Sequence, residues 1–366
     1  MGGARLLPFL FCRQLMPGHL QFYTPPPIIL LTMKRFLVTG GAGFIGSNFV
    51  RYFLSKYPDY SVWVLDALTY AGNTDNFHDL WDNPRFAFFA GRIEDATLVD
   101  NLARNVDCII NFAAESHNDR AILDPETAQK TNFNGVGVLL EAARKYKHIR
   151  FHQVSTDEVY GSTDGEFKEG DPLEPNQPYS AAKAGGELLV RAYNVTFGLN
   201  TIVTRGSNTF GPYHYPEKLI PLMITNAMQD IPLPVYGDGK QERDWMWVLD
   251  HCIGVDIALH QGTPGEIYNV GGGSERHNID VVKGILAALG KPESLIRYVT
   301  DRPGHDRRYS LNTDKMQALG FAPRRDFEVL LEQTVKWYVD NEPWWRKIKA
   351  SDDYQSFTKK WYGDRK

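Results

Sequence analysis

The chain has 366 residues, and its 43% hydrophobic content is enough for one large core or two modest ones. A formal net charge of −4 gives no electrostatic case for binding nucleic acid or an anionic membrane surface. No apolar run approaches the roughly 18–20 residues that a membrane-spanning helix needs, so no membrane partner is expected. The cysteines are sparse and widely spaced, which predicts no disulfide framework and no metal site and fits a reducing cytoplasm; they are Cys12, Cys108 and Cys252.

Residues 1–32 show no helical or strand periodicity, and the run Pro25-Pro26-Pro27 would break a helix. A signal peptide needs a longer unbroken apolar stretch and a small-residue cleavage site, and neither is clear here. We expect a poorly ordered extension with Met33 as the functional start. A targeting peptide is the alternative.

From Lys34 onward, short apolar segments that resemble strands alternate with helical segments. Such alternation predicts an α/β fold with a Rossmann-like, doubly wound parallel sheet. The expected strands are 35–39, 61–66, 85–90, 107–112, 150–155 and 201–205. The expected helices run from a glycine-rich turn to about Tyr57, over 126–146 and over 179–198.

The composition changes after about Gly206, where proline and glycine become frequent and the loops lengthen. Apolar residues at i, i+3, i+4 and i+7 between Val282 and Leu289 predict one helix, and 327–338 shows a second apolar face. We therefore expect a Rossmann-like domain at 33–206 and a smaller C-terminal domain mainly at 207–348, segments of which can return to the first domain. Residues 349–366 are expected to form a tail. The smaller domain would close over the carboxyl edge of the sheet, where doubly wound folds bind ligands.

A glycine-rich turn follows the first strand and opens a helix. Gly40, Gly43 and Gly46 allow a tight turn and let the backbone approach a pyrophosphate, which the helix N-terminus can also bind. Asp66 ends the second strand, 20 residues after Gly46. Its carboxylate can accept the ribose hydroxyls of NAD and would repel the 2′-phosphate of NADP. The sequence therefore predicts an NAD site.

Tyr179 and Lys183 lie four residues apart at the start of a predicted helix, so they share one face. The ammonium is expected to lower the pKa of the phenol, so that the tyrosine can take a proton from a hydroxyl. The spacing alone carries little weight, because two other pairs show it: Tyr52/Lys56 and Tyr236/Lys240. The position of Tyr179 and Lys183, just after the strand that ends in Ser155-Thr156, sets them apart.

Asp157 and Glu158 directly follow that same strand. Two adjacent carboxyls in a closed site repel each other and lose solvent, so one can stay protonated and the pair can supply an acid and a base. A plain dehydrogenase or epimerase does not need both. The pair favours removal of water, and the sequence does not show which carboxyl keeps the proton.

These motifs resemble the extended short-chain dehydrogenase/reductases that act on nucleotide sugars, and more narrowly the dTDP-glucose 4,6-dehydratases, from Lys34 to about Lys347. The matching stretches are specific and occur in order; they include 68–73, 113–117, 155–161, 207–208, 216–221, 236–239, 243–245 and 301–309. The resemblance implies that the first domain binds NAD and that the second binds the nucleotide sugar.

The resemblance also implies a division of chemical roles. Tyr179, aided by Lys183 and Thr156, takes the proton of the C4 hydroxyl while C4 is oxidised. Glu158 then removes the C5 proton and Asp157 protonates the departing C6 hydroxyl. Return of a hydride to C6 and of a proton to C5 gives the 4-keto-6-deoxy product.

Further contacts follow from the resemblance. NAD would contact the glycine turn, Asp66, Tyr179 and Lys183, together with Phe44, Ile45, Leu68, Thr69, Ile93, Ala113, Ala114, Ser116, Thr131 and Asn208. The substrate, dTDP-glucose, would contact His117, Thr156, Asn208, Lys218, Leu219, Pro234, Tyr236, Arg243, Asn278, Asp301, Arg302 and His305. A homodimer is expected, through the helices at 126–146 and 179–198.

The chain departs from the family pattern in three places. Arg92 stands where an aspartate usually bonds the adenine, Gly185-Gly186 interrupts the helix that carries Tyr179, and Leu249 replaces an acidic residue. Other functions stay open: a UDP-glucose 4,6-dehydratase, a nucleotide-sugar 4-epimerase, a decarboxylase of UDP-glucuronate, or a non-catalytic module that senses NAD.

Overall fold

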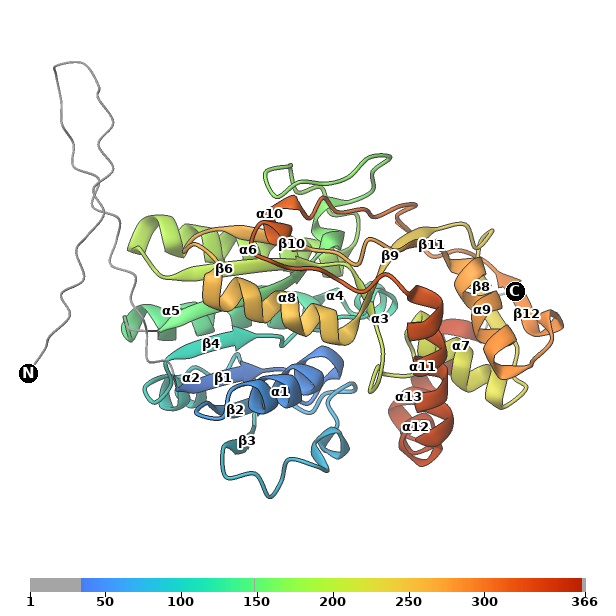
Figure 1. Ribbon diagram of the computed structural model, residues 1–366, viewed down its shortest axis with the longest axis horizontal. Coiled ribbons are helices and arrows are strands. Elements are labelled where there is room, and N and C mark those ends of the chain that lie inside the picture. Colours follow the sequence, from blue (N-terminus) through green and yellow to red (C-terminus); the bar gives the residue numbers. More distant parts are fainter. Residues whose placement is uncertain (1–33, 148, 364–366) are drawn as a thin grey trace, which may run out of the picture. The chain divides into compact units, whose positions relative to one another are not determined.

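The computed structural model describes residues 34–147 and 149–363, so the expectation for residues 1–32 lies outside it. Its main feature is a sheet of seven parallel strands in the order β10-β6-β5-β4-β1-β2-β3, which confirms the predicted α/β fold (Figure 1). The strands are β1 (Arg35–Thr39), β2 (Ser61–Asp66), β3 (Phe86–Ala90), β4 (Cys108–Asn111), β5 (Arg150–Thr156), β6 (Thr201–Gly206) and β10 (Ile267–Val270).

The central strands are buried along nearly their whole length. All four residues of β4 and the first six of β5 are buried, as expected for parallel strands that are covered on both faces. One face packs against α2 (Ala96–Ala103), α5 (Val136–Lys145) and α6 (Pro178–Phe197). The helices α1 (Phe44–Lys56) and α8 (Val248–Gln261) lie together in front of the sheet in Figure 1 and are joined by the ion pair between Lys56 and Asp256.

The helix predicted at 126–146 is present but not uniform. It begins as α4 (Pro125–Gln129), widens to a π-helical segment at Lys130–Gly135, and continues as α5. The adjacent helix α6 packs closely against this segment: a Cβ on Gly186 would lie 2.5 Å from the carbonyl oxygen of Asn132, and one on Gly185 would lie 2.9 Å from the ring of Phe133. The unusual Gly185-Gly186 pair thus allows the two helices to approach.

The second half of the chain builds its own core. A sheet of β7 (Asn208–Phe210), β9 (Glu242–Trp247) and β11 (Glu275–His277) and a pair formed by β8 (Leu233–Tyr236) and β12 (Ile296–Val299) lie at one end of the described structure in Figure 1. Apolar side chains of α7 (Leu219–Met228), α9 (Asn278–Leu289), α11 (Phe327–Asp340) and α12 (Glu342–Lys349) pack around them. β10 and α8 also come from this half but join the seven-stranded sheet.

Several short elements complete the described chain. They are the helical turns Thr74–Phe77, Asp157–Tyr160 (η3) and Glu293–Leu295, and the helices α3 (Asn118–Leu123), α10 (Asp314–Gln317) and α13 (Asp352–Tyr362). The segment 349–366, expected as a tail, therefore contains a helix, and its Tyr354, Phe357 and Trp361 are buried. No helix in the described part of the chain is long and apolar enough to cross a membrane.

The order of the strands places the ligand site. From β1 the sheet continues to one edge through β2 and β3, and from β4 it continues to the other edge through β5 and β6. The strand order therefore reverses between β1 and β4. Ligands of doubly wound folds bind at such a reversal, outside the carboxyl ends of the strands. The two strand ends are tied by Thr39, whose hydroxyl donates to the Asn111 side chain at 2.5 Å.

We predict that Glu187→Gln destabilises the protein strongly. Glu187 lies on α6 and forms a buried ion pair with Arg205 of β6 at 2.7 Å, so the substitution leaves a buried guanidinium without its counter-charge. The free energy of unfolding, measured by urea denaturation, should fall by about 3–5 kcal/mol. Glu342→Gln, which removes an exposed pair with Arg346, should change it by less than about 1 kcal/mol and serves as the control.

Candidate active site

A large cavity opens at the carboxyl ends of β1, β2, β4, β5 and β6, and it brings the glycine turn and the proposed catalytic residues together. Gly40 has a left-handed φ of +67°, and a Cβ there would collide with the backbone of Ala113 at the end of β4. A Cβ on Gly46 would collide with the carbonyl oxygen of Gly40. Glycine is therefore required for the turn to pass close to both neighbours.

Asp66 ends β2 beside this turn and is 8% exposed. Its Oδ2 accepts from the Ala42 amide and its Oδ1 from the Leu68 amide, at 2.9 and 2.8 Å. Burial raises the pKa of Asp66, and these two backbone hydrogen bonds oppose the rise. Each carboxylate oxygen keeps a further acceptor site, so the residue fits a ribose whose hydroxyls donate to it.

The other residues predicted to contact NAD mostly line the same cavity; they are Gly43, Phe44, Ile45, Thr69, Ile93, Ala113, Ala114, Ser116, Thr131, Tyr179, Lys183 and Asn208. Leu68 is not among the lining residues, although its amide holds Asp66. Arg92 lines the cavity too, and Glu94 beside it accepts from the Thr131 hydroxyl at 2.8 Å. An acidic group thus lies two residues beyond the place where the family has its aspartate.

The five predicted catalytic residues meet in the cavity. Thr156 ends β5, Asp157 and Glu158 begin the turn η3, and the first turns of α6 bring Tyr179 and Lys183 to the same wall. The Lys183 ammonium donates to the Val154 carbonyl oxygen at 2.7 Å, and burial lowers the pKa of this lysine to about 8.

The other two Tyr/Lys pairs lie elsewhere. Lys56 donates to the Tyr52 hydroxyl at 2.8 Å, and both side chains bond Asp256 of α8 in a cluster that joins two helices. Tyr236 ends β8, and Lys240 follows in the next turn. Position relative to β5, and not the spacing, marks the pair that faces the cavity.

The pKa of Tyr179 differs from the sequence-based expectation. Burial raises it, and the neighbouring carboxyls of Glu158 and Asp157 raise it further, whereas a hydrogen bond with Thr156 lowers it. The expected lowering of this pKa is wrong for the protein alone, because burial of the phenol raises it and the neighbouring carboxyls raise it further. The phenol is therefore the favoured form in the absence of added positive charge.

The two adjacent carboxyls differ in burial, because Asp157 is buried and Glu158 is only partly buried. Asp157 is 2% exposed, and burial raises its pKa well above the usual range, with further increases from Glu158 and Asp244. Its Oδ1 accepts from the Thr156 hydroxyl at 3.2 Å, and its Oδ2 has no partner within the described residues. Burial therefore favours the protonated form of Asp157, which could donate.

The predicted substrate residues are divided in the structure. Thr156, Asn208, Lys218 and Leu219 line the cavity, and Pro234 lines a second one between α7, α12 and α13. The remaining predicted contacts do not line the main cavity: His117, Tyr236, Arg243, Asn278, Asp301, Arg302 and His305. Their roles stay predictions.

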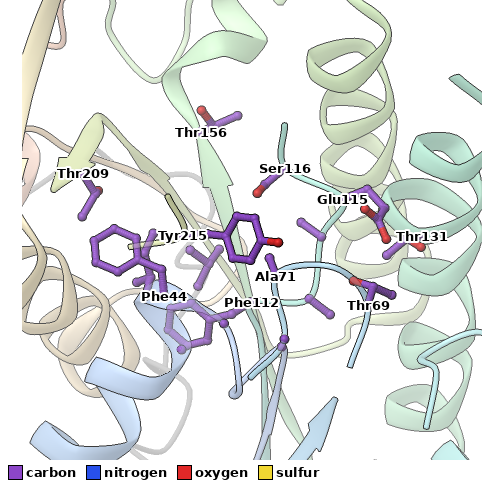
Figure 2. A pocket seen from close by; sticks show the side chains of 18 of the residues that line it. Phe44, Thr69, Ala71, Phe112, Glu115, Ser116, Thr131, Thr156, Thr209 and Tyr215 are labelled. Atoms are coloured by element: carbon purple, nitrogen blue, oxygen red, sulfur yellow. The ribbon is translucent and has the colours of Figure 1, made fainter. Parts of the chain in front are cut away.

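Sequence reasoning missed several residues of the cavity wall. Tyr215 lies across the middle of Figure 2, with its hydroxyl end toward Ser116 and Glu115 and its other end toward Phe44. Glu217 also lines the cavity, and burial raises its pKa to about 7. Glu217 lies in the matching stretch 216–221, which was the available signal for it, whereas Tyr215 lies one residue before that stretch. Among the described residues no three His, Cys, Asp or Glu side chains are grouped as metal ligands.

Comparisons with known proteins agree with this geometry. A family model described as GDP-mannose 4,6 dehydratase matches residues 37–334. The dTDP-glucose 4,6-dehydratase of Xanthomonas campestris is 50% identical over 335 residues, which cover 85% of this chain and 95% of that protein. The chain belongs to the dTDP-glucose 4,6-dehydratase family. The resemblance inferred from the motifs is thereby confirmed.

Two further relatives have similar sequence identity to this chain. The low-salt glycan biosynthesis protein Agl12 of Haloferax volcanii is 50% identical over 307 residues, covering 84% of this chain and 99% of that protein. The crystal structure of DesIV, a dTDP-glucose 4,6-dehydratase from Streptomyces venezuelae with NAD and TYD bound, superimposes with a TM-score of 0.84 at 48% identity, covering 86% of this chain and all of that one.

We predict that Asp157→Asn stabilises the fold. The native state keeps the Asp157 proton to higher pH than the unfolded chain does, so the wild type loses stability as pH rises above the usual aspartate range. An amide has no such loss, and the free energy of unfolding should rise by about 1–2 kcal/mol at pH 8 and by less at pH 5. Urea denaturation at both pH values measures this difference.

Asp82→Asn is the control, because Asp82 is exposed. It should leave the free energy of unfolding nearly unchanged at both pH values. Equal effects of the two substitutions would show that burial of Asp157 carries no cost.

Proposed function

We propose that the protein converts dTDP-glucose to dTDP-4-keto-6-deoxyglucose, with NAD as a retained cofactor. The observation that carries this proposal is the buried Asp157 carboxyl beside Glu158 in the cavity that also holds Tyr179 and Lys183, where burial raises the pKa of Asp157. Family membership and the names of the relatives support it.

The residues of the glycine turn, Asp66 and the cavity wall between them would hold NAD. When bound, NAD supplies the oxidant for C4. The later reduction at C6 regenerates the oxidised cofactor. The cavity fits this cofactor because the turn can approach a pyrophosphate and Asp66 retains acceptor capacity for ribose.

Tyr179 would hold and remove the proton of the C4 hydroxyl. Lys183 and Thr156 flank it on the wall of the cavity, and the Thr156 hydroxyl favours the phenolate. Because burial raises the pKa of the phenol, positive charge brought into the site would make Tyr179 a more effective base.

Asp157 and Glu158 would then remove water. The C4 carbonyl acidifies the C5 hydrogen, and Glu158 takes that proton while Asp157 gives its own proton to the leaving C6 hydroxyl. The atoms lost from C5 and C6 together make one molecule of water. A 4-epimerase or a cofactor-sensing module would have no use for an acid at Asp157.

We also propose that the protein acts as a homodimer in the cytoplasm. The helices expected at the interface carry several exposed large apolar side chains, namely Phe133, Leu188, Val195 and Phe197. Such side chains are favourable to bury against a second copy. The cytoplasmic location rests on the sparse cysteines and on the nucleotide-sugar substrate.

We predict that the purified protein forms the alkali-absorbing 4-keto-6-deoxy product from dTDP-glucose. UDP-glucose should react less well, although the two bases differ by a single methyl group whose burial contributes only about 1 kcal/mol. Product formation from each sugar nucleotide, followed by its absorbance in alkali, measures the preference. If only a C4 epimer accumulates, the dehydratase assignment is wrong.

We predict that Asp157→Asn and Glu158→Gln separate oxidation from water loss. Each removes one proton-transfer group, so turnover should fall by roughly 10²–10⁴-fold while the absorbance of reduced cofactor still appears. Tyr52→Phe is the control, since that tyrosine lies in the α1–α8 cluster and not on the cavity. Undiminished turnover in both carboxyl variants would contradict their roles.

A further inference from the structure

The short helix α3 connects the catalytic turn with the C-terminal part of the chain. Three consecutive residues make its contacts: Asn118 bonds Glu158, Asp119 bonds Tyr236 and Arg302, and Arg120 bonds Glu217 and Asp353. None of the three belongs to a matching stretch of the sequence, because the stretch 113–117 ends just before them.

Asn118 is 5% exposed, and its Nδ2 donates to Glu158 Oε2 at 2.7 Å. Within residues 34–147 and 149–363, this amide is the only side-chain donor hydrogen-bonded to the Glu158 carboxyl. The backbone of Glu158 is held separately, through its N–H to the Thr156 hydroxyl at 3.3 Å. The orientation of the carboxyl about its own side-chain bonds therefore depends on Asn118.

The other two residues of α3 prevent the helix from shifting. Asp119 is 2% exposed and accepts from the Tyr236 hydroxyl at 2.8 Å and from Arg302 at 3.2 Å. Arg120 donates to Glu217 at 2.9 Å and forms an ion pair with Asp353 at 2.7 Å.

The partners of Arg120 anchor α3 to two different parts of the molecule. Glu217 lines the cavity, and Asp353 belongs to α13. The guanidinium also lies over the rings of Tyr70 and Phe357, at 3.9 and 4.4 Å from their centroids. An anchored helix can present the Asn118 amide at a fixed place.

We propose that Asn118 is a positioning residue that orients the Glu158 carboxylate toward the proton it removes. This inference rests on the proposed dehydration. A hydrogen bond to a carboxylate is stronger than one to a neutral group. The Asn118 amide therefore resists rotation of the Glu158 carboxylate away from this orientation.

We test this with Asn118→Leu, which is close in size but has no donor. We expect kcat with dTDP-glucose to fall tenfold or more, KM to change less than twofold, and reduced cofactor to accumulate during turnover. Accumulation is the informative readout, because it places the slowed step after oxidation at C4. Asn118→Asp, which keeps the shape and sets a second carboxylate against Glu158, should show the same pattern with a larger loss.

Asn226→Leu is the matched control. Asn226 is a similarly buried amide that donates to the Pro232 carbonyl at 3.3 Å and does not line the main cavity. It should lower thermal stability without accumulation of reduced cofactor. In a Glu158→Gln background, Asn118→Leu should cause no further loss of kcat, because the two residues act as one unit.

Three results would overturn the proposal: Asn118→Leu behaving like Asn226→Leu, a rise in KM with kcat unchanged, or full additivity with Glu158→Gln. Failure of the proposed function is separate. If the wild type forms no 4-keto product from dTDP-glucose, the dehydratase assignment falls, whereas an active wild type with an unaffected Asn118→Leu variant contradicts this inference alone.

Discussion

The burial of two adjacent carboxyls is the constraint on which the site depends. An ionised carboxylate loses much of its hydration when it is enclosed, and a second one beside it adds repulsion. Both effects raise the pKa of Asp157 and so favour its protonated form, because burial and the neighbouring Glu158 act in the same direction. The same enclosure that disfavours charge therefore produces an acid next to a base.

This arrangement also affects the pKa of Tyr179 and its relation to Lys183. Burial and the neighbouring Glu158 carboxyl raise the pKa of Tyr179, and the Lys183 ammonium donates to the Val154 carbonyl oxygen. The residues of oxidation and of elimination are thus electrostatically coupled through one cavity. In the proposed chemistry, positive charge brought into the site would favour the phenolate.

The packing of α6 delivers these side chains to β5. Gly185 and Gly186 let α6 lie against the π-helical segment at Lys130–Gly135, and the buried pair of Glu187 and Arg205 ties the same helix to β6. Two glycines in a helix cost about 1 kcal/mol each relative to alanine. Here they permit a close contact that a larger side chain would prevent.

The sequence by itself determined the strands, the glycine turn and Asp66, because these depend on local patterns and on fixed spacings along one βαβ unit. It also identified Asp157, Glu158, Tyr179 and Lys183 as candidates. Tertiary structure decided that the pKa of Asp157 is raised, since its burial comes from segments far apart in the chain. It likewise decided that Asn118 reaches Glu158 and that Asp353 of the supposed tail holds Arg120. Those pairs are 40 and 233 residues apart, and no local periodicity encodes such contacts.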